Sequence, residues 1–222
     1  MLFRSDLNIS NAKENGMYNV VSCCAYKYAV DKVKQNAEWE KIEKKMMENT
    51  EEIDASLIQE KISYEKENWF NHEGLRHTKE GSFDFCVETL GIYTNKDIIR
   101  KACDVLLLKL NQIKNSSENG KLFSVKEMPV ALKNSFDIVL YKEDYTIGKI
   151  LEYVMHYSYY RKGLLSFVGF SKRHPHDDNS IIRIAFSDEN TDVANVKNVV
   201  EILHNSCIIA ANVFKEIKTN FQ

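Results

Sequence analysis

The chain has 222 residues, of which 44% are hydrophobic and 28% are charged, and its formal net charge is −2. This length and apolar content suffice for a packed core, so we expect one large or two small folded domains. A nearly neutral chain lacks the excess of Lys and Arg that holds nucleic acid electrostatically, so any contact with DNA or RNA is expected to be indirect.

The five cysteines are odd in number and form no CxxC pair, which is typical of buried thiols in a reducing compartment. No apolar run approaches the roughly 18 residues of a membrane span, so no membrane partner is expected. The sequence also contains no glycine-rich phosphate loop and no recognised metal-ligand pattern. We therefore predict no cofactor and assign no catalytic residue.

Two strands separated by a charged segment are predicted in the first half of the chain. Residues 17–28 are β-branched and aromatic, and apolar residues alternate with polar ones at 82–90. Between them, half of the residues from 40 to 67 are charged, and apolar residues form only a thin helical stripe. This pattern favours a solvated surface insertion at 40–70 that is helical or partly disordered.

A helix and then a boundary follow the second predicted strand. Residues 94–97 fit a capping box, and apolar residues recur at helical spacing from Ile98 to Ile113. The polar stretch 114–121 contains Ser-Ser and Asn-Gly and is the best internal boundary. We therefore divide the chain into regions 1–122 and 123–222.

The second half predicts a strand, a helix, two strands and a long helix. The first strand is expected at 135–142, followed by a helix capped by Asp144 or Thr146, and the next two strands at about 164–171 and 180–187. The final segment has apolar residues at alternating spacings of three and four, which predicts a helix of about 45 Å with a narrow seam suited to one partner helix. These residues are Val193, Val196, Val200, Leu203, Cys207, Ala210, Phe214, Ile217 and Phe221.

Two clusters of polar or aromatic residues admit more than one interpretation. His174, His176, Asp177 and Asp178 could form a metal or acid/base site, or they could simply turn the chain between two strands; Pro, Asp and Asn favour the turn. The tyrosines within 157–160, beside Arg161 and Lys162, could stack on bases or lie at a subunit contact.

The order of elements in 132–222 resembles the small assembly subunit of cellular RNA polymerases. That family comprises the archaeal L subunit, the eleventh subunit of polymerase II and the dimerisation domain of the bacterial alpha subunit. The residues that carry the resemblance include Glu143, Phe167 and Phe170, together with the motif positions Asp144, Thr146, Gly148, Gly169, His174, Pro175 and Arg183.

The first half resembles the larger partner of the same pair, the archaeal D subunit or the third subunit of polymerase II. The matching stretches are the strand from Val20 and residues 29–39, 74–78 and 83–110. This family normally begins with a further strand and helix, so the resemblance implies that the chain is part of a longer fusion or of a split gene. A fusion in this order is similar to the arrangement in large DNA viruses.

The implied fold is α+β, with the alpha-subunit-like dimerisation architecture of small antiparallel sheets, helices packed on one face and a long carboxy-terminal helix. In this family the helices of two partners pack together, and Gly148 would let them approach closely. The residues expected at this interface are Ile99, Ala102, Leu106, Leu110, Ile147, Gly148, Ile150, Leu151, Val154, Val196, Val200, Leu203, Cys207 and Phe214.

The implied function is scaffolding in a DNA-directed RNA polymerase, without catalysis by this chain. The expected partners are the large polymerase subunits and another alpha-like segment or chain that supplies the missing fourth helical stripe. The location would be the cytoplasm, in a virus factory or virion, for a viral source, and the nucleus otherwise. Two alternatives remain: a coiled-coil module that homodimerises through the seam, and a metallohydrolase centred on His174 and His176.

Overall fold

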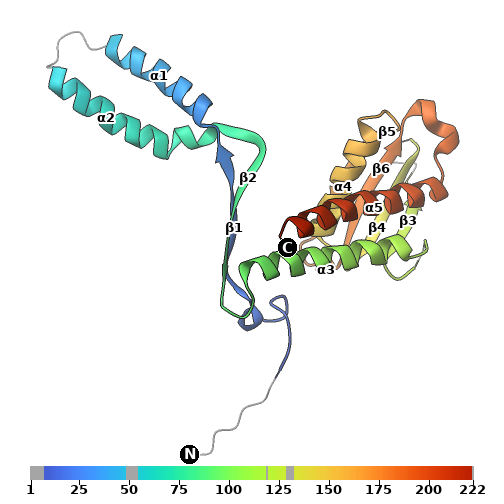
Figure 1. The fold of residues 1–222 in the computed structure, drawn as a ribbon. Coiled ribbons are helices and arrows are strands. Elements are labelled where there is room, and N and C mark those ends of the chain that lie inside the picture. Colours follow the sequence, from blue (N-terminus) through green and yellow to red (C-terminus); the bar gives the residue numbers. More distant parts are fainter. Residues whose placement is uncertain (1–7, 49–54, 119, 129–132, 222) are drawn as a thin grey trace, which may run out of the picture. The chain divides into compact units, whose positions relative to one another are not determined.

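The computed structural model describes residues 8–48, 55–118, 120–128 and 133–221. The chain divides into two compact units, an amino-terminal unit of residues 1–95 and a carboxy-terminal unit of residues 96–222 (Figure 1). The predicted class, α+β with small antiparallel sheets and a long carboxy-terminal helix, is confirmed.

The amino-terminal unit is built on a two-stranded antiparallel ribbon. Strand β1 (Val21–Val30) pairs with β2 (Thr78–Thr89), so both predicted strands exist, although β1 begins later and β2 begins earlier than expected. Aromatic and β-branched residues at alternate positions explain the extended conformation, because they pack well on a pleated surface.

A helical hairpin is inserted between these strands. Helix α1 (Lys32–Glu48) and helix α2 (Ala55–Asn71) cover most of the predicted insertion at 40–70, whose residues 49–54 lie outside the described part. Asp31 begins α1 by accepting hydrogen bonds from the backbone N–H groups of residues 33 and 34, at 3.1 and 3.2 Å. Trp39 then packs against Trp69, with ring centroids 5.7 Å apart.

The carboxy-terminal unit contains a four-stranded antiparallel sheet with the order β3-β4-β6-β5. Strands β4 (Ser135–Tyr141), β5 (Leu165–Ser171) and β6 (Asn179–Phe186) confirm the three predicted strands. Strand β3 (Phe123–Glu127) was not predicted, because its five residues are too few to show alternation.

Helices lie on one face of this sheet (Figure 1). Helix α4 (Tyr145–Met155) continues into a π-helical turn at His156–Tyr160, and α5 (Val196–Asn220) closes the chain. The sheet residues that face these helices include Phe136, Ile138, Leu140, Ile182, Ile184 and Phe186, all of them buried. Burial of this surface supplies the main hydrophobic stabilisation of the unit.

Helix α3 (Asn95–Asn115) belongs to the carboxy-terminal unit, so the division at 95/96 differs from the predicted boundary at 122/123. Leu110 and Ile113 are buried in the core of that unit. Lys218 of α5 also pairs with Asp104 of α3 at 2.5 Å. The polar stretch at 114–121 is therefore a connection inside one unit.

Helix α5 is shorter than predicted at its start. The expected first seam residue, Val193, lies in a 3-10 segment at Asp188–Val193. Asn195 then caps α5 by accepting a hydrogen bond from the backbone N–H of Asn198 at 2.9 Å. The side-chain cap competes with continuation of the helix toward the amino terminus, which hydrophobic spacing cannot reveal.

Candidate functional site

The residues predicted at a pairing interface fall into two groups. Six are partly exposed and one, Ala102, is exposed; the six are Ile99, Leu106, Ile150, Val196, Val200 and Phe214. The other seven are buried within the carboxy-terminal unit: Leu110, Ile147, Gly148, Leu151, Val154, Leu203 and Cys207. A side chain buried in its own core is not available to a partner, so the buried group supports folding of this chain.

The apolar face of α5 is wider than the predicted seam. Val199, Ile202, Ser206 and Ala211 are buried beside the seam residues Leu203, Cys207 and Ala210. A broad buried stripe is typical of a helix packed on a globular core, whereas a coiled-coil seam is narrower. Helix α5 therefore buries a wider face than the predicted seam, and part of this face packs against helix α4 of the same unit.

Gly148 serves a contact inside the chain rather than a close approach between helices. A Cβ at this position would overlap the Phe170 ring of β5. The ring also packs edge-on against Tyr145, with centroids 5.3 Å apart. The absence of a side chain at residue 148 thus lets α4 settle on β5, and the predicted helix–helix role is not needed to explain this glycine.

Apolar side chains nevertheless remain exposed on the helices of the carboxy-terminal unit. Tyr153 of α4 and Tyr157 of the π-helical turn stack with ring centroids 6.4 Å apart, and the Arg161 guanidinium lies 5.2 Å from the centroid of the Tyr157 ring. The large hydrophobic residues exposed on helices α3 and α5 are Val105, Leu108, Ile208, Ile209 and Val213. Periodicity could not separate these from the buried residues, because a helix can be apolar on more than one face.

The amino-terminal unit has almost no hydrophobic core. Among the described residues before Asn95, Trp39 is the only buried hydrophobic side chain, whereas the carboxy-terminal unit buries 23. A two-stranded ribbon is marginally stable in water without a further layer or further strands. This unit therefore carries elements of regular structure without the burial that normally stabilises them.

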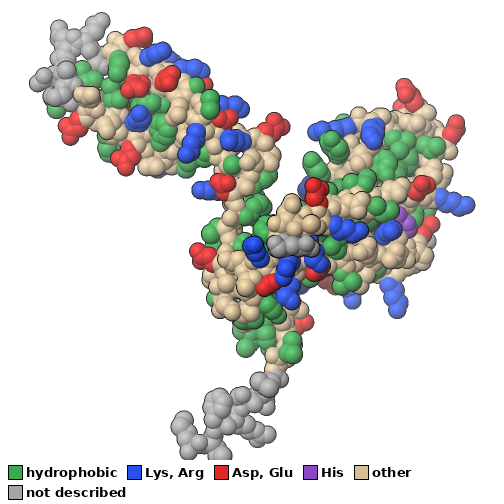
Figure 2. All heavy atoms as spheres, in the orientation of Figure 1, with side chains coloured by type: hydrophobic (Ala, Val, Ile, Leu, Met, Phe, Trp, Pro, Cys, Tyr) green, Lys and Arg blue, Asp and Glu red, His purple; other side chains and the backbone are tan. Residues whose placement is uncertain are grey.

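Four aromatic side chains lie exposed on one face of the ribbon. Tyr26 stands opposite Phe85 and Tyr28 opposite Phe83 in the strand register. These side chains, which we call the aromatic face, are 61%, 71%, 56% and 43% exposed in that order. Their ring centroids are 5.1 to 6.4 Å apart. Figure 2 shows hydrophobic side chains at the surface of both units.

The His174–Asp178 segment forms the bend between β5 and β6, as the turn interpretation predicted. The backbone N–H of Asp177 donates to the His174 carbonyl at 3.0 Å, and all five residues are exposed. The two histidine rings lie 5.1 Å apart. In the described part of the chain, no group of three or more His, Cys, Asp and Glu side chains is placed to hold a metal ion.

The motif residues Asp144, Gly169 and Pro175 have local structural roles. Asp144 caps α4, as predicted, by accepting a hydrogen bond from the backbone N–H of Thr146 at 3.1 Å. Gly169 lies under the ring of Phe167, which a Cβ there would approach to 2.8 Å. Pro175 lies in the β5–β6 bend already described.

Arg183 forms a bidentate ion pair with Asp137. The two carboxylate oxygens accept hydrogen bonds from Nε at 2.6 Å and Nη2 at 2.8 Å. This bonding raises the pKa of Arg183 above its usual value. The sequence analysis did not identify Asp137. A single acid in one apolar strand and a single Arg in another could have predicted an ion pair between the two strands.

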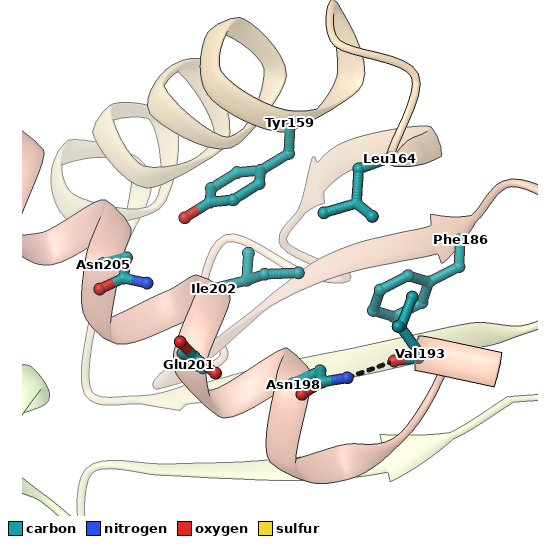
Figure 3. Close-up of a pocket in the computed structure, with 8 residues that line it drawn as sticks. All are labelled: Tyr159, Leu164, Phe186, Val193, Asn198, Glu201, Ile202 and Asn205. Carbon is teal, nitrogen blue, oxygen red and sulfur yellow. Dashed lines mark hydrogen bonds between the residues drawn. The ribbon is translucent and has the colours of Figure 1, made fainter. Parts of the chain in front are cut away.

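A hollow of about 230 Å³ opens between the π-helical turn and the first turns of α5 (Figure 3). Tyr159, Leu164, Phe186, Ile202 and Val193 provide its apolar lining, and polar side chains come from Asn198, Glu201 and Asn205. Burial raises the pKa of the Tyr159 phenol above its ordinary value. No signal in the sequence joined these residues, which come from four separate segments.

The described helices were also considered as membrane spans. None of them is both long enough and apolar enough to cross a membrane.

Comparison with known proteins identified no relative of this chain. No protein-family model matches it, and no curated protein matches it.

Proposed function

We propose that this chain is a non-catalytic assembly subunit of a multisubunit DNA-directed RNA polymerase. It pairs with another alpha-like segment or chain and helps to hold the two large catalytic subunits together. Its contact with DNA or RNA is indirect, and the polymerase chemistry belongs to the large subunits.

The observation that carries this proposal is the unequal burial in the two units. Among the described residues of the amino-terminal unit, Trp39 is the only hydrophobic residue that is buried. The aromatic face of the ribbon in the same unit is exposed. An exposed apolar surface of this kind marks a protein–protein contact. In an assembly subunit, partner chains would cover such an apolar surface, whereas an enzyme that acts alone would leave it exposed to water.

The carboxy-terminal unit supports the proposal through its topology. After β3, a strand, a helix, two strands and a long helix follow one another, with helices on one face of the antiparallel sheet. This is the order that the resemblance to the smaller polymerase partner implies. The alpha-subunit-like architecture is part of the proposal, because many folds combine a small antiparallel sheet with helices.

The direct test is affinity purification of the tagged chain from its native source, followed by mass spectrometry. We expect two very large chains to co-purify in a 1:1:1 ratio with it. The paired variant Tyr26→Ser/Phe85→Ser should reduce this recovery, because it removes apolar area from the aromatic face. Lys27→Ser changes the opposite face of the same ribbon and is the matched control. Recovery of a free monomer under gentle conditions would contradict the proposal.

The homodimeric coiled coil has less support than polymerase assembly. It requires Leu203 and Cys207 to pack against a second copy of α5, but both are buried in the core of their own unit. Sedimentation equilibrium separates the two functions, because the coiled coil alone predicts a dimer that is lost on Val200→Glu and independent of any other chain.

A further inference from the structure

We propose that the hollow between Tyr159 and the start of α5 (Figure 3) is a binding site for a guanidinium group carried on a short apolar stem. The site is separate from the aromatic face and does not depend on the polymerase assembly function. Its shape, its charge and its aromatic wall each restrict the ligand.

The shape favours a small ligand with an apolar part. At about 230 Å³ the hollow accommodates a fragment of about six to eight heavy atoms, if each takes the share of one water molecule. Leu164, Phe186 and Ile202 form the inner lining, so an alkyl stem placed there would displace water from apolar surface.

The charge favours a cation. Glu201 is the one charged residue among the described residues that line the hollow, and its side chain is exposed at the edge of the site. No Lys or Arg belongs to this lining. The nearby Tyr159 phenol stays neutral because burial raises its pKa, so it adds no second negative charge.

The polar groups favour a planar cation with several donors. The Nδ2 of Asn198 donates to the Val193 carbonyl at 2.8 Å, which orients the amide and leaves its Oδ1 as an acceptor. A guanidinium can bind a carboxylate through two N–H groups while it stacks on an aromatic ring. The Glu201 carboxylate and the Tyr159 ring supply these two partners, whereas an ammonium ion would use only the charge.

The test is a titration of the full-length chain, labelled with ¹⁵N, with butylguanidinium, followed by heteronuclear NMR. We expect saturable shifts of the Leu164, Val193 and Ile202 amides in the millimolar range. Butylurea has the same shape without the charge, and it should bind about tenfold more weakly because the charge-assisted hydrogen bonds are lost. Butylammonium should bind with intermediate affinity.

Two variants locate the site. Glu201→Gln keeps the size of the side chain and should weaken butylguanidinium binding about tenfold, to the level of butylurea. Glu216→Gln alters another exposed acid on α5 outside the hollow and should leave binding unchanged. The proposal is overturned if the shifts lie elsewhere, if butylurea binds equally well, or if Glu201→Gln has no effect.

Two further ligands distinguish the sources of a guanidinium. Acetyl-Gly-Arg-Gly-amide that binds as well as butylguanidinium would assign the hollow to an arginine side chain of a partner protein. Agmatine that binds while the peptide is excluded would assign it to a small free cation. Neither result depends on whether the chain co-purifies with polymerase subunits, so failure of one proposal leaves the other standing.

Discussion

Arg183 of β6 and Asp137 of β4 are direct partners in the strand register and are joined by two hydrogen bonds, at 2.6 and 2.8 Å. The Asp137 side chain is 4% exposed and that of Arg183 is 31% exposed. The pair lies on the sheet face opposite to that of Ile182 and Ile184, because adjacent residues of a strand point to opposite faces. A buried carboxylate therefore depends on one partly exposed cation for its compensation.

Arg183→Met should lower the free energy of unfolding by about 3 kcal/mol, because it leaves Asp137 buried without its cation. The double variant Arg183→Met/Asp137→Leu should recover most of this loss, since it removes both charges. Urea denaturation of the full chain measures both effects. Lys197→Met at an exposed position of α5, away from the pair, is the control and should change stability by less than about 0.5 kcal/mol. A single variant as stable as the control would contradict the assigned role of the pair.

Gly148→Ala should destabilise the chain by about 1–3 kcal/mol, even though alanine favours helices, because its Cβ overlaps the Phe170 ring. The cost should shrink in a Phe170→Leu background, where the smaller side chain can move aside. Urea denaturation of the four proteins of this double-mutant cycle gives the coupling between the two positions.

Gly16→Ala is the matched control for that cycle, because no heavy atom lies within 4 Å of the added Cβ. If Gly148→Ala preserves stability but prevents co-purification with other chains, then the glycine acts in assembly and the assignment to the Phe170 contact is wrong.

His204 should make stability depend on pH. Burial lowers the pKa of this imidazole below its ordinary value of 6.5, and the ring packs edge-on against Phe123 at 5.9 Å. The unfolded chain therefore takes up the proton first, so the contribution of His204 is complete above about pH 6.5 and is lost as the pH falls toward the lowered pKa.

The urea concentration at the midpoint of unfolding should accordingly decrease as the pH is lowered from 7.5 to 5.5. His204→Gln should reduce this pH dependence. His176→Gln changes an exposed histidine in the β5–β6 bend and serves as the control. The same pH dependence in the wild type and in His204→Gln would show that another group is responsible.

Hydrogen exchange should separate the two units. The amides of β1 and β2 should exchange at least about 100-fold faster than those of β4 and β6, because the ribbon has no buried layer to protect it. Mass spectrometry of peptides from the free chain measures this ratio. Binding of a partner to the aromatic face should slow exchange in the ribbon alone. Equal protection of the two units in the free chain would contradict the conclusion that the amino-terminal unit lacks a core.

The sequence determined the local structure of much of this protein. Alternation at 82–90 predicted β2, helical spacing from Ile98 to Ile113 predicted α3, and Asp144 was a correct candidate for the cap of α4. Turn-forming residues likewise located the bend between β5 and β6. These features follow from backbone and side-chain preferences that act within a few residues. Each of them can therefore be predicted from its own segment of the sequence.

Only the tertiary structure decided which apolar surface is used within the chain. Leu203 and Ile209 lie on the same helix and are similarly apolar, but Leu203 is fully buried and Ile209 is 40% exposed. The spacing of apolar residues along a helix defines its faces, but it does not show which other element packs against each face. For the same reason the Gly148–Phe170 contact, the Arg183–Asp137 pair and the hollow beside Tyr159 became visible only when separate segments were brought together.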